Sequence, residues 1–139
     1  MSISARFSDS SQRLLMAFLL HNHLDRDLAD LVEAINPREL SQAPPLSTAI
    51  AQSLGEADRL VMRAEAGDKG VPILLRQYLK LNARLIGFNV DPNFGDALDA
   101  LMMVDLTAVD PSILNRYFGR QEAAQFLARH RSGQSAHAA

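Results

Sequence analysis

Only two segments of this chain have the character of β-strands, and they are neighbours in the sequence. This small number of strands most constrains the fold. The two segments are RLIGFNV, residues 84–90, and ALMMVDL, residues 100–106. Each is a short apolar run of strand length. Asp91, Pro92 and Asn93, which follow the first segment, are residues that favour turns. Because a two-stranded sheet is marginal in water, these strands must be covered by helices, pair with a further strand, or pair with another chain.

Most of the remaining sequence has the spacing of amphipathic helices. Apolar residues recur every three or four positions, and Asn, Gly and Pro separate the periodic segments. We expect helices that begin at Asp9 or Ser10, and helices over 25–35, from Ser47 to about 66, from Pro72 to about 83, over 111–118 and over 120–130. We expect Met1–Phe7 to be frayed. The sequence therefore predicts an α+β fold, mostly helical, with a small sheet of two to three strands.

The apolar positions of two of these helices are candidate core residues. The helix over 25–35 would bury Leu24, Leu28, Leu31, Val32 and Ile35. The helix after Pro72 would bury Leu74, Leu75, Tyr78, Leu79 and Leu81.

Length, charge and composition exclude several classes of protein. The chain has 139 residues, which suits one domain. A net charge of -2 gives no electrostatic support for nucleic-acid binding. Without cysteine, disulfides, a thiol nucleophile and thiolate zinc sites are excluded. No apolar run reaches the length of a membrane helix, and the apolar run from Leu14 to Leu20 lacks the flanks of a signal peptide. We therefore expect a cytoplasmic protein. Any association with the inner membrane would be peripheral.

Two phrases in the second half carry a resemblance to a known family. They are KGVPILLRQYLKLNARLIGFNVDPNFGDALDALMMVDL and DPSILNRYFGRQEAAQFLARH. From Gly70 to His130 the chain resembles the closing portion of the bacterial putative hemolysins, which are also described as lysophospholipid or ornithine-lipid acyltransferase-like proteins. The resemblance implies part of an acetyltransferase-like fold and a role in membrane lipid acylation. It implies acyl-coenzyme A or an acyl-carrier protein as the donor.

The resemblance divides the chain into three regions. Residues 66–131 are the region similar to the acyltransferase family. Residues 1–65 form a helical segment of unassigned origin, and we expect 132–139 to be a disordered tail.

One departure from the family concerns catalysis. The phospholipid acyltransferases use a His-x-x-x-x-Asp dyad, in which His is the general base and Asp orients it. Arg26 and Leu28 lie five residues after His21 and His23, so the dyad is absent there. It is absent after His130 as well, so no catalytic residue is assigned, and whether the chain is itself an enzyme stays open. We expect a truncated or split form that binds an acyl donor or lipid, with the missing acyltransferase half or a second copy as partner. The alternative is a non-catalytic interaction domain that forms a dimer.

A polar cluster follows the first helix. His21 and Asp25, like His23 and Asp27, are four residues apart and would share a helix face. Histidine with a carboxylate can bind a metal or act as a base with its orienting partner. The alternative is a polar junction at which the aspartates favour the N-terminus of the second helix; we assign no metal.

Three basic residues recur at intervals of four in the helix after Pro72. Arg76, Lys80 and Arg84 would form one basic edge, with Lys69 upstream. Such an edge suits an anionic lipid headgroup or a coenzyme A phosphate. The alternative is a solvated helix face.

Three aspartates lie in or beside the turn between the two strands. Asp91, Asp96 and Asp99 could collect a divalent cation, since hard cations prefer oxygen ligands, but their spacing does not fit an EF-hand loop. We favour the interpretation that this segment is a strand, an acidic loop and a strand. Asp91 would then lie in an Asx-type turn, Asp96 would cap a short turn, and Asp99 would lead into the second strand. In the family this segment resembles, the loop lies near the presumed acyl or headgroup site, which implies a binding role.

Overall fold

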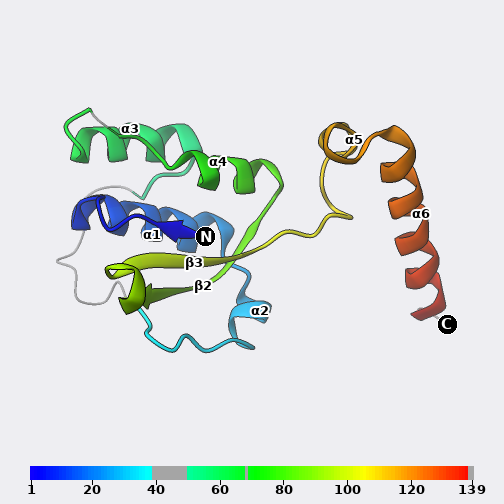
Figure 1. Cartoon of the computed structure of the whole chain (residues 1–139), viewed down its shortest axis with the longest axis horizontal. Coiled ribbons are helices and arrows are strands. Elements are labelled where there is room, and N and C mark those ends of the chain that lie inside the picture. Colours follow the sequence, from blue (N-terminus) through cyan, green and yellow to red (C-terminus); the bar gives the residue numbers. More distant parts are fainter. Residues whose placement is uncertain (39–49, 68, 138–139) are drawn as a thin grey trace. The chain divides into compact units, whose positions relative to one another are not determined.

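The computed structural model describes residues 1–38, 50–67 and 69–137, and the side chains of these residues up to Arg131. Its contacts divide the chain into two compact units, Met1–Met103 and Val104–Ala139. The first unit contains β1 (Ser2–Ile3), α1 (Asp9–His23), α2 (Arg26–Ala29), α3 (Leu54–Ala64), α4 (Ile73–Lys80), β2 (Arg84–Asp91), the 3-10 helix η1 (Pro92–Phe94) and β3 (Ala97–Met103), and the second contains α5 (Pro111–Phe118) and α6 (Arg120–His137) (Figure 1). The α+β class, mostly helical with a small sheet, is confirmed.

The boundary after Met103 separates two compact units of the structure, whereas the expected boundary between residues 65 and 66 separates two regions of the sequence. The expected boundary rests on the family resemblance and stays a prediction. In the structure, helices from before residue 65 and strands from after it belong to one unit, so the family-like segment does not pack as a body of its own.

The sheet is antiparallel in the order β1–β3–β2. Asp91 pairs with Ala97 across the turn, so β3 begins three residues earlier than expected and ends at Met103. The connection is short because Asp91 caps η1, and Gly95 and Asp96 then adopt left-handed conformations that reverse the chain at once. Asp105, which lies within the expected second strand, instead accepts a hydrogen bond from the amide of Thr107 in the turn that follows.

The N-terminal residues are ordered as β1, which corrects the expectation that Met1–Phe7 would fray. Ser2 and Ile3 pair with Asp99 and Leu98, and the amide of Ala100 donates to the carbonyl of Met1 at 2.8 Å. Ile3 is fully buried in the core. The two segments with strand character therefore obtain the third strand that a stable sheet requires.

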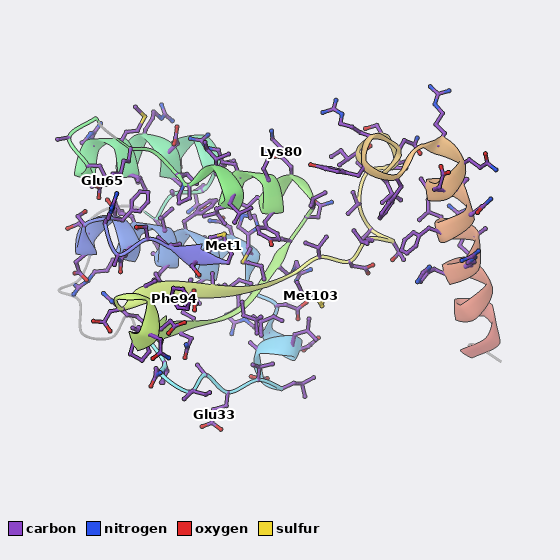
Figure 2. All side chains as sticks on the ribbon, viewed as in Figure 1. Met1, Glu33, Glu65, Lys80, Phe94 and Met103 are labelled. Carbon is purple, nitrogen blue, oxygen red and sulfur yellow. The ribbon has the colours of Figure 1, made fainter. Side chains whose placement is uncertain are left out.

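The core of the first unit lies between α1 and the sheet. Ser8, one residue before the expected caps, accepts a hydrogen bond from the amide of Ser11 and starts α1 at Asp9. The buried face of α1 meets the sheet and the residues around α3 and α4 (Figure 2). The principal core residues are Ile3, Leu15, Met16, Phe18, Leu19, Val61, Leu75, Leu85, Phe88, Leu98 and Ala100. Figure 1 shows α3 and α4 on the α1 side of this unit and α2 beside β2.

The helix expected over 25–35 is only the one-turn α2, and no residue of its expected apolar stripe is fully buried, although Leu24 packs against the core. Leu31 is 79% exposed and Ile35 is 92% exposed. After α2, Asn36 lies against the outer edge of β2, where its carbonyl accepts from the amide of Val90 at 2.8 Å. Its own amide donates to Oδ1 of Asn89 at 2.7 Å. These edge bonds hold the segment extended, and a continued helix would not reach them.

The next two helices are also shorter than expected. Ser53 caps α3, whereas Ser47, the expected cap, lies outside the described residues. The α4 helix ends at Lys80, because Asn82 adopts a left-handed conformation and the chain then enters β2. Of the five residues expected to face inward here, Leu75 alone is fully buried, and Leu74 is 54% exposed.

The second unit is a helical hairpin. Asp110 caps α5 and Gly119, with φ of 86°, ends it, so α5 spans the expected residues 111–118. Phe118 and Phe126 pack at 6.0 Å between ring centroids. The α6 helix continues to His137, so most of the expected disordered tail over 132–139 is helical. Within the described ranges, no helix combines the length and apolar character needed to cross a membrane.

Candidate functional site

An open groove of about 490 Å³ lies on the sheet of the first unit. One wall is the segment after α2, with Val32 and Ile35, and the floor is the paired stretch of β2 and β3 around Gly87 and Leu101. This volume lies in the range of about 300–1,000 Å³ that small-molecule sites occupy. The groove belongs entirely to the first unit, so its geometry does not depend on the second.

The floor of the groove is the sheet face opposite the core. Successive strand residues point to opposite faces, and Phe88, Leu98 and Ala100 belong to the core. Gly87 and its cross-strand partner Leu101 therefore face the groove. A Cβ at Gly87 would meet no atom within 4 Å, so the missing side chain leaves the floor open. A bulge between Leu85 and Gly87 shifts the register there, so that Leu85 and Phe88, which are three residues apart, both face the core.

The other end of the groove is polar. The hydroxyl of Ser2 donates to Oδ1 of Asp99, and Asp99 pairs across the sheet with Asn89. Asn89 donates a hydrogen bond from its side-chain amide to the carbonyl of Val90. The groove thus offers an apolar surface that ends in groups capable of hydrogen bonding.

Of the three expected aspartates, Asp99 alone lines this groove. Asp91 makes the expected turn, accepting from the amide of Asn93 at 2.9 Å. Asp96 is exposed with φ of 59°, and the cap of the 3-10 helix is Asp91, not Asp96. Asp99 lies within β3 rather than before it. In the described part of the chain, no three or more His, Asp or Glu residues gather as a metal site would require.

The expected basic edge is not one surface. Arg76 is a structural residue that joins α4 to α3 and the loop before it. Its guanidinium pairs with Asp58 and donates from Nε to the carbonyl of Val71 at 3.1 Å, while Asp58 accepts from the amide of Val71 at 2.8 Å. The Arg76 hydrogen bond, and then the Val71 amide, lower the pKa of Asp58. A Cβ at Gly70 would overlap the Asp58 carboxylate, so the interactions of Asp58 with Arg76 and Val71 also require a glycine at this position.

The other two basic residues diverge. Arg84 is the first residue of β2 and lies 3.7 Å from Asp25, whereas Lys80 ends α4. Arg84 therefore does not share a helix face with Arg76 and Lys80, because α4 has already ended at Lys80.

The polar cluster after α1 is mainly a helix junction. Asp25 caps α2, accepting from the amide of Leu28 at 3.2 Å, and Asp27 is exposed in its first turn, as the junction interpretation predicts. His21 is exposed. His23 differs from these, because it is half-buried and packs edge-on against Phe18 with 5.3 Å between ring centroids. Burial, and then the charge of Arg84, lower the pKa of His23.

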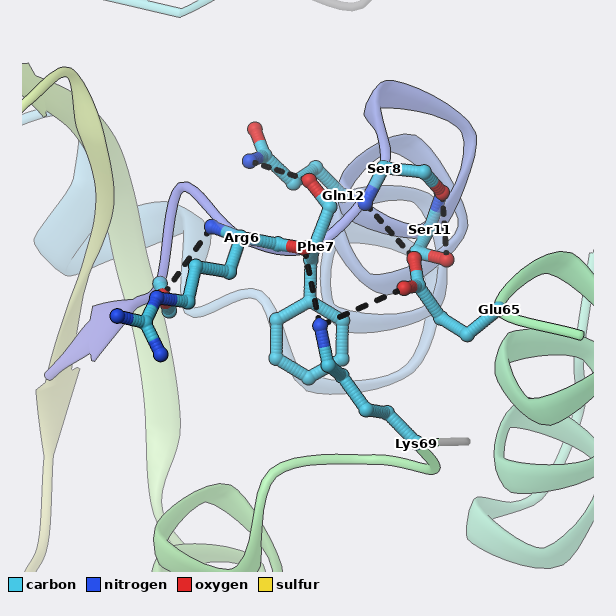
Figure 3. Close-up of polar contacts among 8 residues, drawn as sticks. Arg6, Phe7, Ser8, Ser11, Gln12, Glu65 and Lys69 are labelled. Carbon is cyan, nitrogen blue, oxygen red and sulfur yellow. Dashed lines mark hydrogen bonds and ion pairs between the residues drawn. The ribbon is translucent and has the colours of Figure 1, made fainter. Parts of the chain in front are cut away.

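A further polar cluster, near the start of α1, has no clear signal in the sequence (Figure 3). Glu65, which follows α3, accepts from the amide of Ser8 at 2.7 Å, and its carboxylate lies 3.8 Å from Nζ of Lys69. Lys69 in turn donates to the carbonyl of Arg6 at 3.1 Å and lies over the ring of Phe7. This cluster holds the turn between β1 and α1 against the end of α3, and so has a structural role.

Sequence reasoning also missed the groove residues Val32, Ile35, Gly87 and Leu101. The sequence signal for this groove is Gly87, since a glycine inside a strand often indicates a bulge or a site where a ligand or another backbone approaches closely. Comparisons with known proteins add no further constraint: no protein-family model matches the chain, and no match was found among curated proteins or solved structures.

Proposed function

We propose that this chain is an acyltransferase-related protein of membrane lipid metabolism that binds the acyl chain of a donor or lipid in the sheet groove. The observation that carries the proposal is the open apolar floor at Gly87 and Leu101 beside the exposed wall residues Val32 and Ile35. The resemblance of residues 70–130 to the acyltransferase-like family supports the same substrate class. Transfer itself is assigned to a separate partner half, because the His-x-x-x-x-Asp dyad is absent from the sequence.

The energetics of the groove favour a thin apolar chain. Burial of each methylene group contributes about 0.8 kcal/mol. Several methylenes on the floor would also cover Leu101, which is 48% exposed, and the apolar wall. The polar end with Ser2, Asn89 and Asp99 would meet the ester, thioester or headgroup of the ligand.

The test fills the groove by mutation. In Gly87→Leu the new side chain enters the open floor, and leucine suits an apolar strand. We expect decanoyl-coenzyme A and a lysophospholipid to raise the melting temperature of the wild type saturably, since they bind the native state. Free coenzyme A lacks the chain, so its effect should be the same in the wild type and in Gly87→Leu, whereas Gly87→Leu should lose the shift that depends on the acyl chain.

Gly55→Leu is the matched control. A Cβ at Gly55 also meets no atom within 4 Å, but Gly55 lies in the first turn of α3 and does not line the groove. This variant should keep the response to both acyl ligands. Binding that survives in Gly87→Leu, or no binding in the wild type, would contradict the acyl-groove proposal.

The second candidate function is dimerisation through the same region. It is favoured by the exposure of Leu31 and Ile35 beside the groove. A stable interface buries more than about 1,000 Å² in total, so a second copy would have to cover the wall and the floor together. Analytical ultracentrifugation distinguishes the two: a dimer that Ile35→Glu dissociates, with no response to acyl ligands, would replace ligand binding by self-association.

A further inference from the structure

A second cleft, of about 460 Å³, lies where three helices of the first unit end or begin. Phe18, Asn22 and His23 come from the last two turns of α1, Ser53 from the start of α3, and Leu79 and Lys80 from the end of α4. In the sequence, His23 and Lys80 belong to two unrelated patterns. The fold brings them to one cleft, which is independent of the acyl groove.

The ring of His23 is available to a ligand. Across the described residues, no hydrogen bond to another group engages its nitrogens, and no side-chain nitrogen or oxygen is buried without a partner. The ring nitrogens are therefore accessible to solvent, and His23 lines the cleft. Because burial and Arg84 lower the pKa of His23, its imidazole is neutral in the empty cleft at neutral pH.

The cleft carries a positive charge that no carboxylate of its lining offsets. Lys80 is exposed, and within the part of the chain that the structure describes it forms no ion pair. Two acidic residues adjoin the lining, and each has a partner: Glu56 of α3 accepts from the amide of the lining residue Gln52 at 2.8 Å, and Asp25 lies 3.7 Å from Arg84 of β2.

Two further polar side chains of the lining are Asn22 and Ser53. Asn22 donates from Nδ2 to the carbonyls of Phe18 and Ala51, at 2.9 and 2.8 Å. Ser53 accepts from the amide of Glu56 through its hydroxyl oxygen, which leaves its hydroxyl proton free to donate. Lys80 and Ser53 thus present donors to one space, with His23 beside them.

We propose that this cleft binds a small anionic group, a carboxylate or a phosphate, between Lys80 and Ser53, and that His23 takes up a proton when the anion binds. An anion beside the ring favours the imidazolium. A protonated His23 then becomes a further donor to the anion. Burial and Arg84 oppose this protonation in the empty cleft, and the bound anion offsets them. Because a carboxylate keeps its charge over this range, acetate should therefore bind more tightly at pH 6 than at pH 8.

The test follows the histidine ring signals by NMR as a function of pH. Inorganic phosphate and acetate are the probes, and chloride at equal ionic strength is the control. We expect phosphate or acetate to raise the pKa of His23 saturably, while the ring signals of His21, exposed and two residues away on the same helix, do not respond to the anion. The anion that shifts His23 at the lower concentration identifies the ligand class.

Two variants decide where the anion binds. Lys80→Gln should weaken the response of His23 about tenfold or more, since a hydrogen bond to a charged group is lost. Lys69→Gln removes the same charge outside the cleft and should leave the response unchanged. An equal response of His21 and His23, a response to chloride alone, or an unaltered affinity in Lys80→Gln would overturn the proposal.

Discussion

Among single residues, Glu65 makes the clearest contribution to stability that depends on pH. The side chain is 10% exposed. Hydrogen bonds from Ser11 and Ser8 and the charge of Lys69 lower its pKa from 4.5 to about 2. A carboxylate whose pKa is lower in the folded state stabilises the fold fully above the unfolded pKa. That contribution is lost as the pH falls from about 4.5 towards 2.

Glu65→Gln keeps the shape of the side chain and removes its charge. We expect this variant to melt at a lower temperature than the wild type at pH 7, and we expect the two melting curves to converge near pH 2. Glu33→Gln is the control, because Glu33 is exposed. Melting temperatures measured from pH 7 to pH 2 check this, and a difference that stays constant over that range would argue against it.

At the scale of elements, the short strand β1 completes the sheet. Its pairing with β3 buries Ile3 among the side chains of α1 and the sheet. Removing most of a buried isoleucine side chain costs transfer free energy and leaves a cavity. A frayed terminus, which we expected from its position at the chain end, would make no such contribution.

We therefore expect Ile3→Ala to lower the free energy of unfolding by about 2–4 kcal/mol. Ile73→Ala is the same change at a position that is 75% exposed in α4. It should alter the free energy of unfolding by no more than about 0.5 kcal/mol. Urea denaturation of both variants gives the comparison, and equal effects would mean that β1 is not part of the folded core.

At the scale of the whole molecule, the two units differ in the core that each possesses. The first unit has one contiguous core of residues from α1, α3, α4 and the sheet. The second unit buries Val109, Leu114 and Ala123. Domains shorter than about 40 residues seldom bury enough surface to fold alone.

We expect the fragment 1–103 to unfold cooperatively and the fragment 104–139 to have little helix by itself. Circular dichroism with thermal melting of the two fragments measures both properties. Strong cooperative helix in 104–139 would show that the hairpin contacts between α5 and α6 suffice for its stability. A fragment 1–103 without a melting transition would show that its core is incomplete.

Local signals in the sequence determined several features of the protein. Asp91 before Pro92, Asp110 before Pro111 and Gly119 act within a few residues of themselves, and they end or start elements where the sequence places them. Apolar periodicity likewise identified α1 and the existence of both central strands, so the α+β class follows from the chain itself.

Only the tertiary structure decided the features that depend on distant partners. Arg84 leaves the basic edge because α4 ends early, and Arg76 is committed to Asp58. The segment after α2 is extended because β2 bonds to Asn36. The groove at Gly87 and the meeting of His23 with Lys80 likewise need long-range packing. The apolar periodicity of a sequence indicates which residues share a face of one helix or strand, whereas a binding site forms where the faces of different elements meet.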